Sequence, residues 1–221
     1  MSSVVSELST LIYRAILDHW FRKYHVRRSV LSVQDAVFVH ELVTCSQRRV
    51  FDLSGNYIQS WVTAHGVSPI VGELIHEGFT RVLGEKLGDY VIVYEREFTK
   101  LVNLGNRVVT VIGTPDIVLL KGEVPEVVVD IKFTRSPKIP YDHHKLQVML
   151  YRWLTGAKYS FLLYVCPDAG LKLIEVSEYL TDDDVAKLVK ETLENLAHPR
   201  FEWECQYCIY KSICPYARTS P

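Results

Sequence analysis

Two β-rich runs, residues 106–120 and 126–134, are separated only by the segment Lys-Gly-Glu-Val-Pro at 121–125. Such a short connection between runs rich in β-branched residues predicts an antiparallel hairpin. Asp116 and Asp130 are equally distant in sequence from Glu123, so a regular hairpin places their carboxylates nearly opposite each other. Side chains alternate along a strand, and Lys132 therefore points to the same face as Asp130. The hairpin thus predicts two acids and a lysine on one face of otherwise apolar strands.

These three side chains suggest a hydrolytic site. Asp130 follows three valines, where a carboxylate is costly to bury unless a cation or a lysine neutralises it. Because Mg²⁺ and Mn²⁺ prefer oxygen ligands, Asp116, Asp130 and the backbone carbonyl of Ile131 could hold such an ion, with water and phosphate completing its shell. Lys132 could orient or deprotonate the attacking water, or neutralise charge on the phosphate. Ordinary charges on two surface strands are the alternative interpretation.

The segments Gly113-Thr-Pro-Asp116 and Asp130-Ile-Lys132 resemble motifs II and III of the RecB-like PD-(D/E)XK nucleases. The resemblance implies an α/β fold with a restriction-endonuclease-like core, in which helices flank a mixed central β-sheet. It also implies that both aspartates bind metal and that the lysine is catalytic. Many members of the family carry glutamate at the position of Asp130.

Two predicted helices extend the resemblance. The segment from Gly72 to His76 is similar to motif I, which implies that His76 is a further metal ligand, and imidazole favours Mn²⁺ over Mg²⁺. Gln147 and Tyr151 lie one helical turn apart and resemble the family's QxxxY motif, whose side chains help to position the metal site and the DNA backbone. For His76 and Tyr151, a place in the hydrophobic core is the alternative.

Three cysteines are closely spaced as Cys205-x2-Cys208-x5-Cys214. This spacing is typical of a metal or cluster site, and a fourth ligand could come from Cys45 or from Cys166. Cys166 ends an apolar strand and is expected in the core, because free cysteine behaves as a small hydrophobic residue. Four thiolates suit either an iron–sulfur cluster or structural Zn²⁺.

One cysteine before the nuclease motifs and three after them resembles the iron–sulfur branch of the RecB-like nucleases. Within that branch, the short chain is similar to the CRISPR-associated exonuclease family Cas-four, over most of its length from Cys45 to Pro215. The resemblance implies a 4Fe–4S cluster, in preference to 2Fe–2S, on four ligands: Cys45, Cys205, Cys208 and Cys214. It further implies a single-strand DNA exonuclease, cleaving from 5′ to 3′, that processes fragments for spacer acquisition beside the integration proteins Cas-one and Cas-two. A stand-alone RecB-like repair or mobile-element nuclease and a non-catalytic iron–sulfur DNA-binding module are the alternatives.

Composition limits how such a protein could hold DNA. The 221 residues have a formal net charge of -1 and a pI near 6.7. DNA therefore has to bind at a local cluster of positive charge, because the protein as a whole has no positive electrostatic potential to attract it. The candidate local charges are Arg135, Lys138, His143, His144 and Lys145.

No apolar run reaches the roughly 20 residues that span a bilayer and no signal core begins the chain, so a soluble, cytoplasmic protein without a disulfide framework is expected. A homo-oligomer is compatible with the sequence.

The remaining pattern predicts one nuclease domain over residues 1–221, with the cysteine module formed by Cys45 and the segment 205–214. Helices are expected over 4–24, where a basic cluster (Arg22, Lys23, Arg27, Arg28) follows, over 68–88, over 142–154 and from Thr181 onward. Further strands are expected over 91–99, 158–166 and 171–179.

Overall fold

The computed structural model describes residues 7, 10–11, 14, 35–54, 68–136 and 138–218. The chain divides into two compact units, residues 1–36 and 37–221, and the second contains every site discussed below. Residues 7, 10, 11 and 14 are helical, and the rest of the helix expected over 4–24, with its basic cluster, lies outside the described residues.

A six-stranded sheet carries the predicted hairpin, with the strand order β2-β3-β6-β7-β8-β9. Its strands are β2 (Lys86–Leu87), β3 (Tyr90–Tyr94), β6 (Ile117–Lys121), β7 (Val124–Phe133), β8 (Tyr159–Cys166) and β9 (Gly170–Glu175). Neighbouring strands are antiparallel except β7 and β8, which run parallel. The expected mixed sheet and the antiparallel pairing of the hairpin strands are therefore confirmed.

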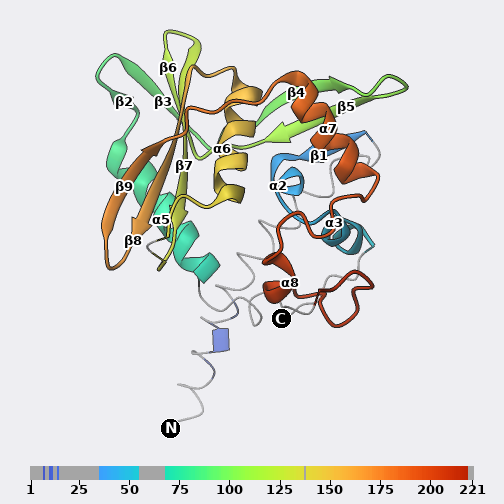
Figure 1. Ribbon diagram of the computed structural model, residues 1–221. Helices are drawn as coiled ribbons and strands as arrows, with labels where there is room; N and C mark the ends of the chain where they lie inside the picture. The colour runs from blue at the N-terminus through green and yellow to red at the C-terminus, as the bar shows by residue number, and fades with distance from the viewer. Residues whose placement is uncertain are drawn as a thin grey trace. The chain divides into compact units, whose positions relative to one another are not determined.

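Two helices pack against opposite faces of this sheet (Figure 1). They are α5 (Ser68–Leu83) and α6 (Asp142–Thr155). Ile75 of α5 packs against the apolar cluster that contains Ile131, whereas Val148 of α6 shares the larger core with Val128 on the other face. Because side chains alternate along β7, Asp130 is on the α6 side, with Val128.

A second sheet has three strands in the order β1-β5-β4. They are β1 (Ala36–Phe38), β4 (Phe98–Asn103) and β5 (Val108–Gly113). The runs 91–99 and 106–120, each expected as one strand, are both divided between the two sheets, so this expectation was wrong. The first run breaks at Glu95, which has a left-handed φ of 44°. The second breaks before Pro115, which has no N–H to continue a ladder.

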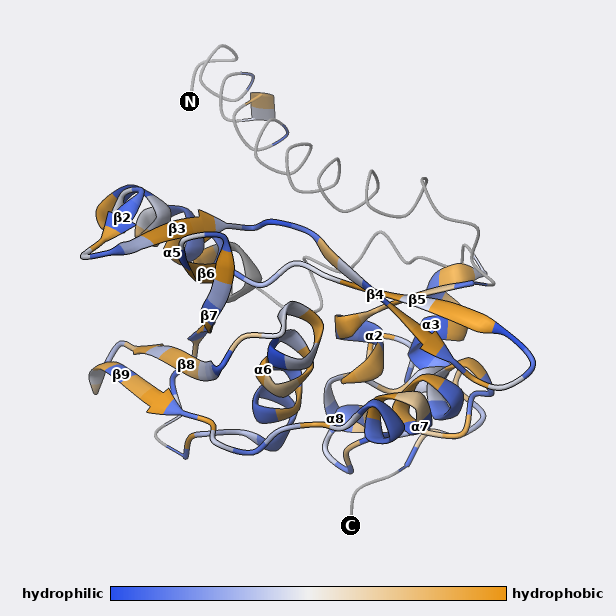
Figure 2. Ribbon diagram, turned by 90° about the horizontal axis from the view of Figure 1, so that it is seen from above, coloured by the Kyte–Doolittle hydropathy of each residue, from blue (hydrophilic) through white to orange (hydrophobic). Residues whose placement is uncertain are grey.

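The remaining helices are α2 (Val39–Leu42), α3 (Ser46–Leu53), α7 (Asp182–Leu193) and α8 (Glu204–Tyr207). In both ribbon views α6 lies between the β8–β9 strands and the β4–β5 hairpin, and Figure 2 shows hydrophobic and hydrophilic bands alternating around it. α7 starts as expected, because the Thr181 hydroxyl accepts a hydrogen bond from the Asp184 N–H at 3.2 Å. Among the described residues, none of the helices combines the length and apolarity that a membrane span requires.

Two helix ends differ from those expected. α5 ends at Leu83 instead of continuing to Gly88, because Gly84 adopts a left-handed φ of 67° and the chain turns into β2. α6 ends one residue later than expected, at Thr155, and Gly156 caps it with a φ of 72°. Strand β9 covers only the first part of the run expected over 171–179.

Candidate active site and cysteine pocket

The register of β6 and β7 brings the two aspartates together. Next to the tight turn at Gly122, where φ is 64°, Leu120 pairs with Pro125, and a β-bulge that leaves one extra residue in β7 then shifts the register, so that Ile117 pairs with Val129. Extending this register by one residue places Asp116 opposite Asp130. The sequence predicted this pairing from a regular hairpin, but the bulge is what aligns the two positions.

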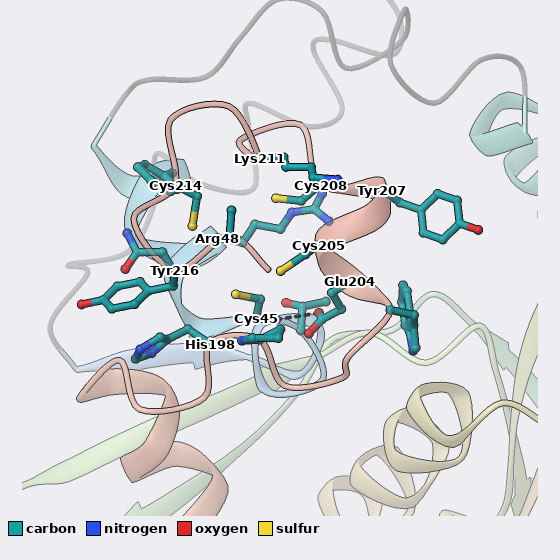
Figure 3. Close-up of a pocket in the computed structure, with 16 residues that line it drawn as sticks. Cys45, Arg48, His198, Glu204, Cys205, Tyr207, Cys208, Lys211, Cys214 and Tyr216 are labelled. Atoms are coloured by element: carbon teal, nitrogen blue, oxygen red, sulfur yellow. Dashed lines mark hydrogen bonds between the residues drawn. The ribbon is translucent and has the colours of Figure 1, made fainter. Parts of the chain in front are cut away.

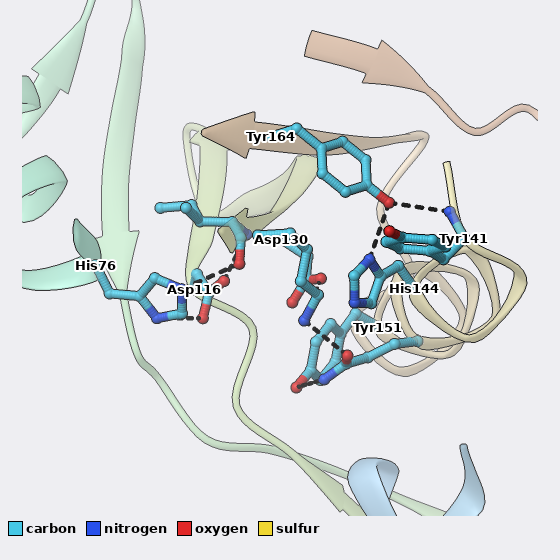
Figure 4. Close-up of polar contacts among 10 residues, drawn as sticks. His76, Asp116, Asp130, Tyr141, His144, Tyr151 and Tyr164 are labelled. Atoms are coloured by element: carbon cyan, nitrogen blue, oxygen red, sulfur yellow. Dashed lines mark hydrogen bonds and ion pairs between the residues drawn. The ribbon is translucent and has the colours of Figure 1, made fainter. Parts of the chain in front are cut away.

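Asp116 is at the centre of one set of contacts (Figure 4). Its Oδ2 accepts a hydrogen bond from the Ile131 N–H at 2.6 Å, and its Oδ1 lies 3.5 Å from Nδ1 of His76. The other ring nitrogen of His76, Nε2, lies 3.0 Å from the Ile131 carbonyl oxygen. Burial, together with the nearby Asp130 carboxylate, raises the pKa of Asp116 to about 6. Two carboxylates thus compete for limited neutralising charge at this end of the hairpin.

Asp130 and Lys132 belong to a second set of contacts, directed toward α6. Asp130 is 1% exposed, and its Oδ2 lies 2.8 Å from Lys132 Nζ without an aligned hydrogen bond in the described part of the chain. The same ammonium donates to Gln147 Oε1 at 2.8 Å, and Gln147 Nε2 donates to the Tyr151 hydroxyl at 3.2 Å. The structure therefore brings the predicted QxxxY pair into direct contact with the predicted lysine.

The candidate site draws on both faces of the sheet. His76 comes from α5, whereas Gln147 and Tyr151 come from α6.

Gly113 permits the approach of α6, because a Cβ there would lie 2.7 Å from the Leu154 side chain and 3.0 Å from that of Tyr151. No sequence pattern predicted this close contact between Gly113 and α6.

His143 and His144, expected to add positive charge, do not do so at neutral pH. Burial and the nearby Lys132 ammonium lower the pKa of His143 to about 4 and that of His144 to about 2. His144 Nδ1 lies 2.9 Å from the Tyr164 hydroxyl, and His143 packs against aromatic rings. The expectation of two further cations here was therefore wrong.

These two neutral histidines predict an acid-sensitive fold. In the unfolded chain each of these imidazoles binds a proton near pH 6.5, but in the folded chain it does not. The contribution of the two histidines to stability is therefore complete above that pH and falls as the pH decreases. When the pH is lowered from 7.5 to 5, the free energy of unfolding should fall in both proteins. The fall should be about 1–2 kcal/mol smaller in the His144→Asn variant than in the unmodified protein. Denaturant unfolding at both pH values tests this, and identical losses would contradict it.

Four of the five cysteines line one cavity of about 240 Å³ (Figure 3). These are Cys45, Cys205, Cys208 and Cys214, and all are free thiols. Cys166 is instead buried in the hydrophobic core at the end of β8, as expected. The structure therefore brings Cys45, and not Cys166, to the three closely spaced cysteines.

Glu204 joins the two chain segments that form this cavity. Its Oε1 accepts from the Cys45 N–H at 2.7 Å, and its Oε2 accepts from the N–H groups of Arg200 and Phe201, each at 2.8 Å. Sequence reasoning missed Glu204, because no local pattern indicates a partner 159 residues away. Around the thiols, burial raises the pKa of Cys45 and of Cys208, while the Arg48 guanidinium acts in the opposite direction on Cys208.

Comparison with known proteins identifies the family of this chain. Residues 15–215 match the family described as the PD-(D/E)XK nuclease superfamily. The chain is 30% identical over 196 residues to the CRISPR-associated exonuclease Cas4 of Saccharolobus solfataricus (strain P2), covering 88% of this chain and 94% of that protein. The chain belongs to the Cas4 family of PD-(D/E)XK nucleases.

The solved structures support the same family fold. The crystal structure of SSO0001 aligns with a TM-score of 0.80 and 29% sequence identity, covering 94% of this chain and 98% of that chain. The resemblance to Cas4 that the hairpin motifs and cysteine spacing suggested is thus confirmed at the level of the family. The described part of this Cas4-family chain contains no His, Cys, Asp or Glu triplet arranged around a single metal ion.

Proposed function

We propose that this nuclease is a Mn²⁺- or Mg²⁺-dependent exonuclease that degrades single-stranded DNA from 5′ to 3′. The observation that carries the proposal is the Lys132 ammonium, held between the buried Asp130 and Gln147 beside a second, partly buried acid, Asp116. We further propose that it processes DNA fragments for spacer acquisition beside Cas-one and Cas-two. The words "CRISPR-associated exonuclease" in the name of its relative support this context.

The chemistry of the donor set suits a hard divalent cation. The buried Asp130 Oδ2 lacks an aligned hydrogen-bond donor among the described residues, and Asp116 Oδ1 lies 3.5 Å from Nδ1 of His76. His76 Nε2 and the Ile131 carbonyl oxygen are 3.0 Å apart, close to the separation of adjacent ligands around an octahedral ion with bonds of roughly 2.1 Å. When bound, such an ion would supply Lewis-acid activation of water and phosphate.

The protein's own residues have separable roles in this proposal. Asp116, Asp130, His76 and the Ile131 carbonyl would hold the cation. Lys132 would orient the attacking water and offset the charge that develops on the phosphate. Gln147 accepts from Lys132 and donates to Tyr151, so this pair keeps the ammonium in one position while substrate binds.

The cysteine pocket favours an iron–sulfur cluster over zinc. A tetrahedral Zn²⁺ with bonds of roughly 2.3 Å would draw its four sulfurs close around one point. The four thiols line a shared cavity of about 240 Å³, which offers more room than one such ion needs. We therefore propose a 4Fe–4S cluster on Cys45, Cys205, Cys208 and Cys214, with Arg48 and Lys211 of the same pocket offsetting its negative charge.

A cleavage assay tests this function directly. Single- and double-stranded oligonucleotides, labelled at the 5′ or the 3′ end, are incubated with Mn²⁺, Mg²⁺ or EDTA. We expect metal-dependent release of short products from the 5′ end of single strands, with EDTA abolishing cleavage. Cleavage of the duplex alone, or undiminished cleavage in EDTA, would refute the proposal. Co-purification with Cas-one and Cas-two distinguishes a role in spacer acquisition from a repair or mobile-element nuclease.

A further inference from the structure

Aromatic rings form a continuous row from α6 to α8. His143 lies 4.7 Å from Trp203 between ring centroids, and Trp203 lies 6.4 Å from Tyr207. The ring of Phe201 also contacts the row, with its centroid 5.9 Å from that of His143 and 6.1 Å from that of Trp203. The outer rings are accessible, since Trp203 is 41% exposed and Tyr207 is 69% exposed. Large exposed aromatic side chains in contact with one another are unusual on a surface that binds nothing.

The row starts at the candidate active site. His143 is one helical turn before Gln147, which accepts the Lys132 hydrogen bond, so the two side chains share one face of α6. At its other end, Tyr207 lies at the cysteine pocket and points away from the sulfur atoms (Figure 3). The row therefore extends from the candidate catalytic lysine to the outer rim of the cysteine pocket.

We propose that His143, Trp203 and Tyr207 form a platform on which successive bases of a single DNA strand stack while its scissile phosphate lies at Lys132. This inference rests on the proposed nuclease function. Aromatic side chains bind unpaired bases of any sequence, because every base presents a flat π-face. Paired bases in a duplex keep those faces covered, so the platform would make the active site selective for single strands.

The cysteine module determines where this platform lies. Cys205 is buried at the pocket, in the same four-residue helix α8 that carries Tyr207, and Trp203 immediately precedes this helix. Glu204, between Trp203 and Cys205, is hydrogen-bonded to the Cys45 N–H. The cysteines thus hold a DNA-binding surface in position beside the hydrolytic centre. This positioning role requires no electron transfer.

Single-strand binding in EDTA, which prevents cleavage, tests the platform. Fluorescence anisotropy with a labelled oligothymidine should show a roughly tenfold higher Kd for Trp203→Ala and for Tyr207→Ala, since each variant removes one ring on which a base stacks. Trp203→Phe should retain most of the affinity. Tyr159→Ala is the matched control, because Tyr159 is 38% exposed but pairs with Val127, near the start of β7 and away from Lys132. Iron content confirms that each variant keeps its pocket.

Two further measurements distinguish this inference from the function on which it rests. Hydrolysis of thymidine 5′-p-nitrophenyl phosphate, which has no neighbouring bases, should be unchanged in Trp203→Ala. Fluorescence of 2-aminopurine placed next to the cleavage site should fall when the unmodified protein binds and not when Trp203→Ala binds. Unchanged single-strand affinity in both alanine variants, or an equal loss of duplex affinity, would overturn the platform. Absence of all cleavage by the unmodified protein would instead refute the nuclease proposal.

Discussion

Replacing Lys132 with alanine is expected to slow DNA cleavage by about 10³-fold, the scale on which a lost general acid–base or charge-stabilising group acts. The Lys132 ammonium is 2.8 Å from Asp130 and 2.8 Å from Gln147, so neither of its partners can replace it. Lys132→Arg should be nearly as inactive, because a planar guanidinium cannot occupy the same compact position. The rate of product release from labelled single-stranded DNA, under saturating Mn²⁺, measures the effect.

The control variant for this experiment is Lys121→Ala, which removes an exposed lysine at the far end of β6 and should cleave normally. Without bound metal, Lys132→Ala also deprives the buried Asp130 carboxylate of its ion pair, which can destabilise the fold by itself. The double variant Asp130→Asn/Lys132→Gln removes both charges with little change in shape, so it should fold well and remain inactive. Cleavage at the normal rate by this double variant would show that the hydrolytic site lies elsewhere.

Replacing Cys208 with alanine is expected to remove the cluster and lower the melting temperature by roughly 10 °C. The cluster would connect Cys45 to the segment 205–214, and a link that closes so long a loop stabilises the folded state by on the order of 4 kcal/mol. In a chain of this size, each kcal/mol corresponds to roughly 2–4 °C. Iron content, visible absorbance and thermal unfolding of anaerobically purified protein provide the measurement.

Cys166→Ala is the matched control for the cluster, because it removes a thiol that is buried in the core and does not line the pocket. It should keep its iron and lose only about 1 kcal/mol, as expected for a small change in core volume. The same Cys208→Ala protein should bind single-stranded DNA more weakly, since α8 carries part of the proposed platform. Full iron content and an unchanged melting temperature in Cys208→Ala would contradict the proposed ligand set.

Much of the candidate site could be predicted from short-range signals. Alternation along a strand indicated that Asp130 and Lys132 share a face, and the short connection indicated the pairing with Asp116. The spacing of Gln147 and Tyr151 likewise placed both on one side of a helix. Each of these inferences uses only local backbone geometry, which depends on neighbouring residues and varies little from one protein to another.

By itself, the sequence determined the mixed α/β class, the hairpin with its acids and lysine, and the three closely spaced cysteines. Only the tertiary structure decided that Cys45 and not Cys166 completes the pocket, that Glu204 connects its two halves, and that His143 is neutral in an aromatic row. It also divided two β-rich runs between separate sheets. These outcomes depend on which distant segments pack together and how far they exclude water, and both are properties of the assembled core that no local pattern contains.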